Sequence, residues 1–315
     1  MKTHCLPLWI AAVLVLCAGC QTDDYARRII APETTGGRTW MSVAGSGDQL
    51  VQQKRIDMCR RIPAPDKTEI DVWVLKAQGT SRGTVVILHG LGESKGMHPY
   101  FGAAQRLQQR GYDVVLADLR AHGRSGGKYV TYGAMEKNDV KAVVDALLKE
   151  GAVDERIYVF GATLGGTVAI QYAAIDPRCR GVLALTPYKG IAGARVWMPV
   201  WMNDQDFQKV LTRAGEIGEF NPAEASCVEA ARKLKCPLVL VHGLIDLVVP
   251  FENSQAIFDA ANEPKKLLAV TPGLERAALL TFFEDWIAEK MDLLVQGKIL
   301  QMATTGAATT EPVKP

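Results

Sequence analysis

The sequence predicts an α/β protein with a mostly parallel sheet, helices on both faces of that sheet and a small helical lid. Three observations support this fold class. Short apolar runs recur along the chain, helix-like runs separate them, and one long segment interrupts the alternation. Strands that are apolar along their whole length are typical of a parallel sheet covered by helices on both faces. At 315 residues, 48% of them hydrophobic, the chain is long enough for one such domain with additions at its ends.

The elements follow from hydrophobic periodicity. Residues 70–74 alternate between apolar and polar, which predicts a strand with one buried face. Continuous apolar runs predict further strands at residues 84–88, 113–117, 156–160, 181–185, 237–241 and 266–270. Helical runs are expected at residues 99–110, 138–149, 167–174, 252–261 and 276–295. Residues 187–235 are too many for a plain connection between two strands, so we expect them to form the lid.

The N-terminus reads as a targeting segment. Lys2 precedes an apolar run at residues 6–16 that is too short to span a bilayer comfortably. The run ends in Cys17-Ala-Gly-Cys20 and polar residues follow. This arrangement resembles a bacterial lipoprotein signal, which implies a signal peptide at residues 1–19 and a lipid on Cys20, although such signals usually carry leucine in place of Cys17. A cleaved secretory peptide and an uncleaved anchor are the alternatives.

The resemblance to Gram-negative lipoproteins also implies a location. No Asp directly follows Cys20, which favours an exported protein on the periplasmic side of the outer membrane. Residues 20–54 are polar and contain glycine, so we expect a tether, followed by the folded domain at residues 55–295. Residues 296–315 are expected to form a disordered tail.

Charge and cysteine content exclude some classes of partner. A net charge of +2 gives no reason to expect a nucleic-acid partner. Four cysteines lie outside the signal segment, at Cys59, Cys179, Cys227 and Cys236. Export permits disulfides, buried free thiols are equally consistent, and the sequence does not choose a pairing. No spacing suggests a metal site, and we expect no cofactor.

Motifs that carry chemistry follow four of the predicted strands. They are His89-Gly-Leu-Gly92, the loop from Asp118 to Ser125, Gly161-Ala-Thr-Leu-Gly-Gly166, and His242-Gly-Leu-Ile-Asp246. Sites in parallel sheets form at the carboxyl ends of the strands, so these motifs should meet at one edge. Together and in this order they resemble the α/β-hydrolase superfamily, in particular its branch of serine aminopeptidases and monoacylglycerol-lipase-like enzymes. The resemblance spans roughly residues 55–295.

The resemblance implies a role for each matching position. Thr163 takes the place of the nucleophile and Asp246 that of the catalytic acid. The backbone N–H groups of Leu91 and Leu164 match the oxyanion hole. The histidine should follow the last strand, but that position carries Arg276.

Two members of this triad are therefore changed. In this superfamily the histidine follows the acid, yet all five histidines, at positions 4, 89, 98, 122 and 242, precede Asp246. Arginine offers no lone pair to accept a proton, so Arg276 cannot be the base. We expect it to form an ion pair with Asp246 instead. The β-branched Thr163 also suits a strained elbow poorly.

The sequence thus favours a membrane-tethered, catalytically impaired member of the hydrolase fold that binds a ligand or a protein partner. The alternative is an active esterase, lipase or peptidase that uses Thr163. The run Trp197-Met-Pro-Val-Trp-Met202 in the lid either packs the lid onto the body or lines a pocket for a hydrophobic or acyl ligand.

Overall fold

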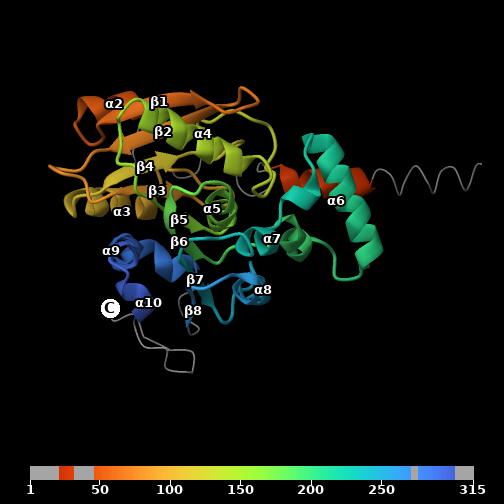
Figure 1. Ribbon diagram of the computed structural model, residues 1–315. Helices are drawn as coiled ribbons and strands as arrows, with labels where there is room; N and C mark the ends of the chain where they lie inside the picture. The colour runs from red at the N-terminus through yellow and green to blue at the C-terminus, as the bar shows by residue number, and fades with distance from the viewer. Residues whose placement is uncertain (1–20, 32–45, 271–275, 302–315) are drawn as a thin grey trace, which may run out of the picture.

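The computed structural model describes residues 21–31, 46–270 and 276–301, and the side chains of these residues outside 266–282. Within these ranges one eight-stranded sheet forms the centre of the molecule, in the order β1-β2-β4-β3-β5-β6-β7-β8 (Figure 1). The β1–β2 and β2–β4 pairs are antiparallel, whereas the remaining neighbours from β4 to β8 run parallel. The predicted fold class, a mostly parallel sheet with flanking helices, is confirmed.

The strands are β1 (Met58–Pro63), β2 (Glu69–Leu75), β3 (Thr84–Leu88), β4 (Asp113–Ala117), β5 (Ile157–Ala162), β6 (Cys179–Leu185), β7 (Leu238–Gly243) and β8 (Lys265–Val270). The helices of the body are α2 (Gly47–Gln52), α3 (His98–Gln109), α4 (Glu136–Lys149), α5 (Leu164–Ile175), α8 (Glu252–Ala260), α9 (Arg276–Val295) and α10 (Lys298–Gln301). The segment between β6 and β7 forms η2 (Ile191–Trp197), α6 (Asp204–Gly218), η3 (Pro222–Glu224) and α7 (Cys227–Ala231).

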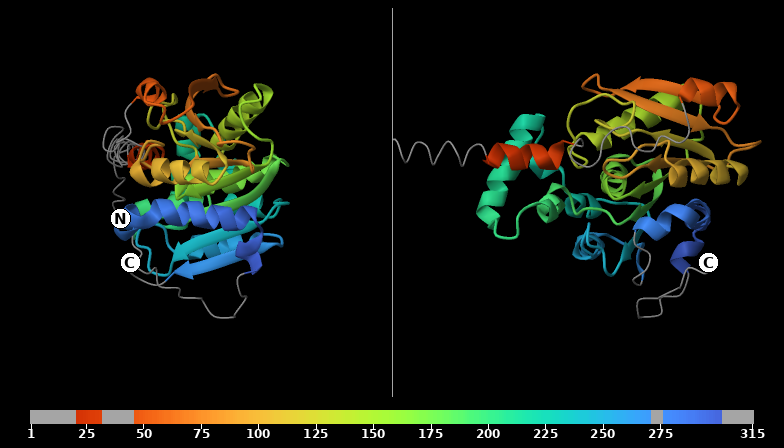
Figure 2. Two further views of the ribbon diagram at one scale, coloured as in Figure 1. Left: turned by 90° about the vertical axis from the view of Figure 1, so that its left-hand side faces the viewer. Right: turned by 180° about the vertical axis from the view of Figure 1, so that it is seen from behind.

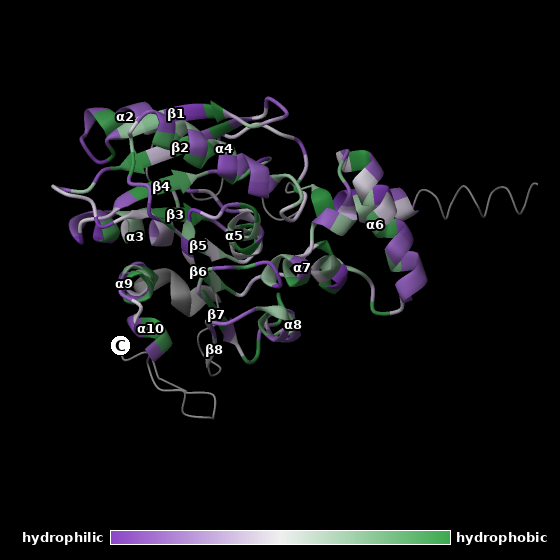
Figure 3. Ribbon diagram, in the orientation of Figure 1, coloured by the Kyte–Doolittle hydropathy of each residue, from purple (hydrophilic) through white to green (hydrophobic). Residues whose placement is uncertain are grey.

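Helices cover both faces of the sheet. α3 and α9 lie on one face, and α4, α5 and α8 lie on the other (Figures 1 and 2). β3 and β4 are buried along their whole length, as their apolar sequences require. The strands at the centre of the sheet are mainly hydrophobic, whereas α4 presents polar residues to solvent (Figure 3).

The strand at residues 70–74 differs from its prediction. The expected alternation between a buried and an exposed face is wrong, because Asp71 and Trp73 are both buried. β2 lies between β1 and β4, and helices cover both of its faces, so the polar residue is buried with the others. Asp71 tolerates this position because the ammonium of Lys95 lies 2.5 Å from its carboxylate.

Parts of the predicted tether and of the predicted tail are helical. Residues 21–30 form a helix within the predicted tether, and its Ile29 and Ile30 are buried. Further along the same segment, α2 buries Leu50. At the other end, α10 lies within the predicted disordered tail and buries Ile299. In each case a few apolar side chains within a polar segment are buried in the core. The average composition of the segment does not reveal them.

The lid is a helical segment that stands off from the sheet, with α6 at the side of the molecule (Figure 1). Met198 and Met202 are buried, so part of the apolar run packs the lid onto the body. Val200 and Trp201, between them, are exposed. The four cysteines from Cys59 onward are free thiols, and three of them are buried.

Candidate active site

Thr163 occupies a sharp turn between a strand and a helix. β5 ends at Ala162 and α5 begins at Leu164, so a single residue makes the change of direction. Its backbone has φ 46° and ψ −107°, a combination that is an outlier for a β-branched residue. Thr163 N–H donates to the Leu185 carbonyl at 2.8 Å, and its own carbonyl accepts from Thr167 N–H at 3.0 Å. Such strain costs about 1–3 kcal/mol and persists only where the surroundings enforce it.

The glycines of this motif are explained by close packing of the backbone. A Cβ on Gly165 would lie 2.2 Å from the carbonyl oxygen of Leu88, at the end of β3. A Cβ on Gly161 would lie 2.2 Å from the carbonyl oxygen of Gly165. Neither approach leaves room for a side chain, so the small residues around Thr163 are required by the turn itself, whatever chemistry it carries.

The predicted oxyanion donors lie beside Thr163. Leu91 N–H donates to Thr163 Oγ1 at 3.3 Å. Leu164 is the first residue of α5, and the N–H groups of a first helical turn have no acceptor within the helix. Leu91 N–H thus contacts the threonine hydroxyl, and Leu164 N–H belongs to the residue that follows Thr163 in the chain.

A carboxylate shares this space with the hydroxyl. Glu93 Oε2 accepts hydrogen bonds from Gly90 N–H at 2.8 Å and from the Tyr100 hydroxyl. A Cβ on Gly90 would lie 2.5 Å from Thr163 Oγ1 and 2.6 Å from Glu93 Oε2. The acceptor that stands near the threonine is therefore a glutamate, not the imidazole expected in a triad. Sequence reasoning missed Glu93.

Asp246 follows β7 and is held by backbone donors. Its Oδ1 accepts from Val248 N–H and Val249 N–H, both at 2.8 Å, and its side chain is 22% exposed. Thr163 and Asp246 lie at the carboxyl ends of β5 and β7, with β6 between them. Among the residues that the structure describes, no hydrogen bond joins the two. The side chain of Arg276 lies outside the described residues, so its ion pair with Asp246 stays a prediction.

The histidines at residues 89 and 122 are committed to structural hydrogen bonds. His122 Nε2 accepts from Gly92 N–H at 3.0 Å, so Nδ1 carries the proton and donates to the Arg120 carbonyl at 2.8 Å. Burial, reinforced by His89, lowers the pKa of His122 to about 4, and the ring is neutral at pH 7. His89 follows the same pattern: its Nε2 accepts from Leu119 N–H at 3.0 Å and its Nδ1 lies 2.8 Å from the Gly90 carbonyl.

The remaining described histidines do not supply a base either. His242 Nε2 donates to the Val249 carbonyl at 2.7 Å, and its Nδ1 accepts from the Ser254 hydroxyl at 2.7 Å. His98 is 59% exposed at the start of α3 and lies 3.7 Å from Glu284. His4 lies outside the described residues. Over the described part of the chain, no imidazole is placed to take a proton from Thr163.

The chain resembles known hydrolases along most of its length. A family model described as serine aminopeptidase, S33, matches residues 79–214. The uncharacterized protein YfhR of Escherichia coli (strain K12) is 23% identical over 219 residues, which are 67% of this chain and 70% of that protein. The monoacylglycerol lipase of Mycolicibacterium smegmatis is 27% identical over 242 residues, which are 65% of this chain and 84% of that protein.

Solved structures share the fold of this chain. The esterase Pf2001 of Pyrococcus furiosus superposes with a TM-score of 0.62 at 24% identity and covers 78% of this chain and 95% of its own. Est1E of Butyrivibrio proteoclasticus, in a structure with bound ferulic acid, superposes with a TM-score of 0.60 at 19% identity and covers 75% of this chain and 99% of its own.

The family match, the related lipase and the solved structures together support membership of the α/β-hydrolase superfamily. The turn at Thr163 and the loop that carries Leu91 meet at the carboxyl ends of β5 and β3. No group of three or more His, Cys, Asp or Glu residues in the described ranges could hold a metal ion. In the same ranges, no helix is both long and apolar enough to cross a membrane.

The loop that carries Leu91 and Glu93 is supported by a buried ion cluster that the sequence did not predict. The Lys95 ammonium lies 2.5 Å from carboxylate oxygens of both Asp71 and Asp118. Asp118 also accepts from Lys95 N–H at 2.9 Å. Burial alone would raise the pKa of Asp118, but Lys95 and His89 more than offset this and lower it. The cluster fixes the loop that carries Leu91 and Glu93 against the ends of β2 and β4.

Proposed function

We propose that this protein is a membrane-tethered lipoprotein with the α/β-hydrolase fold that is catalytically impaired and binds a ligand or a protein partner. The observation that carries the proposal is the lack of a base: the described histidines beside the site are committed elsewhere, and no histidine follows Asp246 in the sequence. A hydroxyl without a base is a poor nucleophile at neutral pH.

The placement of Glu93 supports the same conclusion. An oxyanion hole works because its donors present positive charge to the developing oxyanion. Here the carboxylate of Glu93 lies in the same loop as Leu91 and accepts from the neighbouring Gly90 N–H. The Gly90 N–H is therefore committed to Glu93 and is not available to a substrate oxygen. The ligand class that we propose is a hydrophobic or acyl compound, in line with the relatives described as a monoacylglycerol lipase and an esterase.

An ester-hydrolysis assay tests the proposal. Purified protein and the Thr163→Ala variant are compared on para-nitrophenyl esters with short and medium acyl chains. We expect equal rates for the two proteins, because Thr163 contributes nothing without a base. A rate that falls to background in Thr163→Ala would overturn the proposal.

Glu93 also favours a second candidate function, an active hydrolase of esters or peptides that uses Thr163. In that case the carboxylate near the threonine hydroxyl is the proton acceptor. Glu93→Gln keeps the shape of the side chain but removes its charge. If the second candidate is right, Glu93→Gln and Thr163→Ala lose the same activity. If the protein is catalytically impaired, both variants hydrolyse the esters at the same rate as the wild type.

A further inference from the structure

The helix at residues 21–30 is held at both ends, by the lid near its start and by the body at its end. Near its start, the Asp23 carboxylate receives two hydrogen bonds from the Arg213 guanidinium of α6, at 2.5 and 3.1 Å. At its end, the Ile30 carbonyl accepts from Val130 N–H at 2.8 Å, and the Ile29 carbonyl accepts from the Tyr132 hydroxyl at 2.9 Å. The helix therefore links the lid to the body and has a defined direction.

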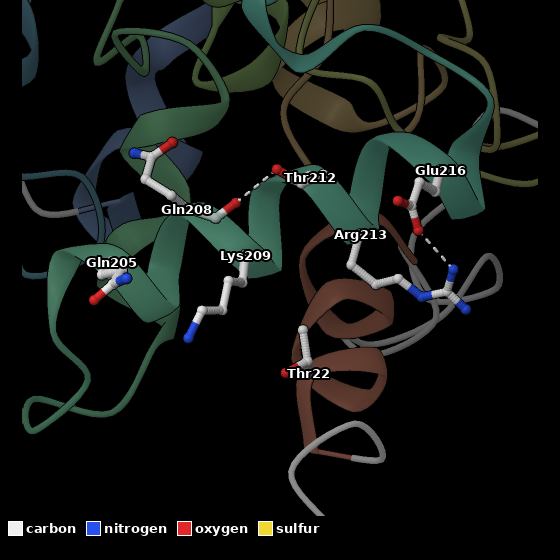
Figure 4. A pocket seen from close by; sticks show the side chains of 7 residues that line it. All are labelled: Thr22, Gln205, Gln208, Lys209, Thr212, Arg213 and Glu216. Carbon is white, nitrogen blue, oxygen red and sulfur yellow. Dashed lines mark hydrogen bonds and ion pairs between the residues drawn. The ribbon is translucent and has the colours of Figure 1, made fainter. Parts of the chain in front are cut away.

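That direction places the predicted lipid attachment beside the lid. Thr22 and α6 residues from Gln205 to Glu216 line an open groove of about 480 Å³ (Figure 4). Cys20 lies outside the described residues, but it precedes Thr22 by only two positions in the sequence. Two residues of chain span about 8 Å at most. A lipid on Cys20 would thus be attached beside α6.

The most exposed apolar side chains of the lid lie just before α6. Val200 is 99% exposed and Trp201 is 71% exposed, in the turn that leads into α6. The flanking Met198 and Met202 are buried, so the turn is held to the body on both sides while its tip projects. In Figures 1 and 2 the start of the helix at residues 21–30 and the start of α6 both lie at the end of the molecule farthest from the sheet.

We propose that the tip formed by Val200 and Trp201 contacts the lipid bilayer to which Cys20 is attached. The inference rests on the proposed tethering. Tryptophan suits the boundary between lipid and water because its ring is apolar and its N–H is polar. Lipid on Cys20 and the tip would then touch one membrane surface, and the helix at residues 21–30 sets the orientation, with the lid toward the bilayer. This arrangement presents the lid to apolar ligands held in the membrane.

Quenching by brominated lipids tests the contact. The full chain is produced in an exporting bacterial host, purified in detergent and reconstituted into phosphatidylethanolamine–phosphatidylglycerol vesicles with and without brominated acyl chains. Bromine quenches tryptophan that reaches the acyl region. Trp201→Phe is compared with Trp286→Phe, a control in α9, where Trp286 stacks on Phe283. We expect Trp201→Phe to lose several-fold more of the lipid-dependent quenching than Trp286→Phe, and Val200→Glu to lower that quenching with all tryptophans present.

Equal losses in the two tryptophan variants would overturn the bilayer contact. Flotation of the vesicles separates this failure from a failure of the proposed function. Protein that floats with the vesicles without quenching at Trp201 is tethered but does not use the tip. Protein that does not float is not tethered, and both ideas fall. In another outcome, the protein self-associates in detergent, shows no quenching at Trp201 and loses the self-association in Trp201→Phe. That result would assign the tip to a second copy of the chain and would also overturn the proposal.

Discussion

Removal of the Lys95 charge is the sharpest test of how the loop that carries Leu91 and Glu93 is held. The ammonium is 2% exposed and lies 2.5 Å from both Asp71 and Asp118, whose side chains are equally buried. Lys95→Met keeps most of the volume and leaves two buried carboxylates without their cation. Breaking a buried pair in this way costs about 3–5 kcal/mol. We expect the free energy of unfolding, measured with urea at pH 7, to fall by that amount.

The control is Arg61→Met. Arg61 also pairs with Asp71, at 3.7 Å, but its side chain is 58% exposed, and such surface pairs contribute about 0–1 kcal/mol. The pH dependence has a defined sign as well. Without Lys95, burial raises the pKa of Asp118, so the variant is destabilised where Asp118 is charged. Its deficit relative to wild type should shrink as pH falls from 7 toward about 4. A Lys95→Met variant within 1 kcal/mol of wild type at pH 7 would refute this account.

Three further predictions follow from the site. Thr163→Ser combined with Arg276→His should restore measurable esterase activity, and neither change alone should, because triad members act as a unit. A folded double variant that hydrolyses the ester no faster than buffer does would show that the pocket is lost too. Burial lowers the pKa of His122 to about 4. The neutral ring therefore contributes about 3 kcal/mol to the free energy of unfolding above the unfolded-state pKa of about 6.5, and this contribution is lost as pH falls toward 4. In urea unfolding, the free energy of unfolding of His122→Gln should fall less over that pH range than that of the wild type. Gly165→Ala should lower the melting temperature by an amount equivalent to about 1–3 kcal/mol, whereas Gly243→Ala, which meets nothing within 4 Å, should not.

The sequence sufficed for the parts of the fold that depend on local pattern. Continuous apolar runs identified β3 and β4, and the spacing of small residues around Thr163 located the turn before α5. These features are short-range, because a strand covered on both faces and a tight turn each produce a recognisable residue pattern within a few positions. The orientation of the strands then followed from the order of elements.

The features that were missed depend on partners far apart in the chain. Lys95 reads as a surface residue, and only the fold brings it to Asp71 and Asp118. Glu93 gains its place near Thr163 in the same way. The helix at residues 21–30 is too short to be stable alone and is held by contacts with α6 and residues 130–132. Its polar composition therefore indicated a tether.

The most direct test of the central claim is covalent labelling by a fluorophosphonate, which reacts with activated hydroxyl nucleophiles and not with ordinary ones. Intact-mass measurement reports whether one adduct forms per chain. If Thr163 lacks a base, the wild-type protein should stay unlabelled, as Thr163→Ala does. Stoichiometric labelling of the wild type that disappears in Thr163→Ala would show an activated nucleophile and contradict the account.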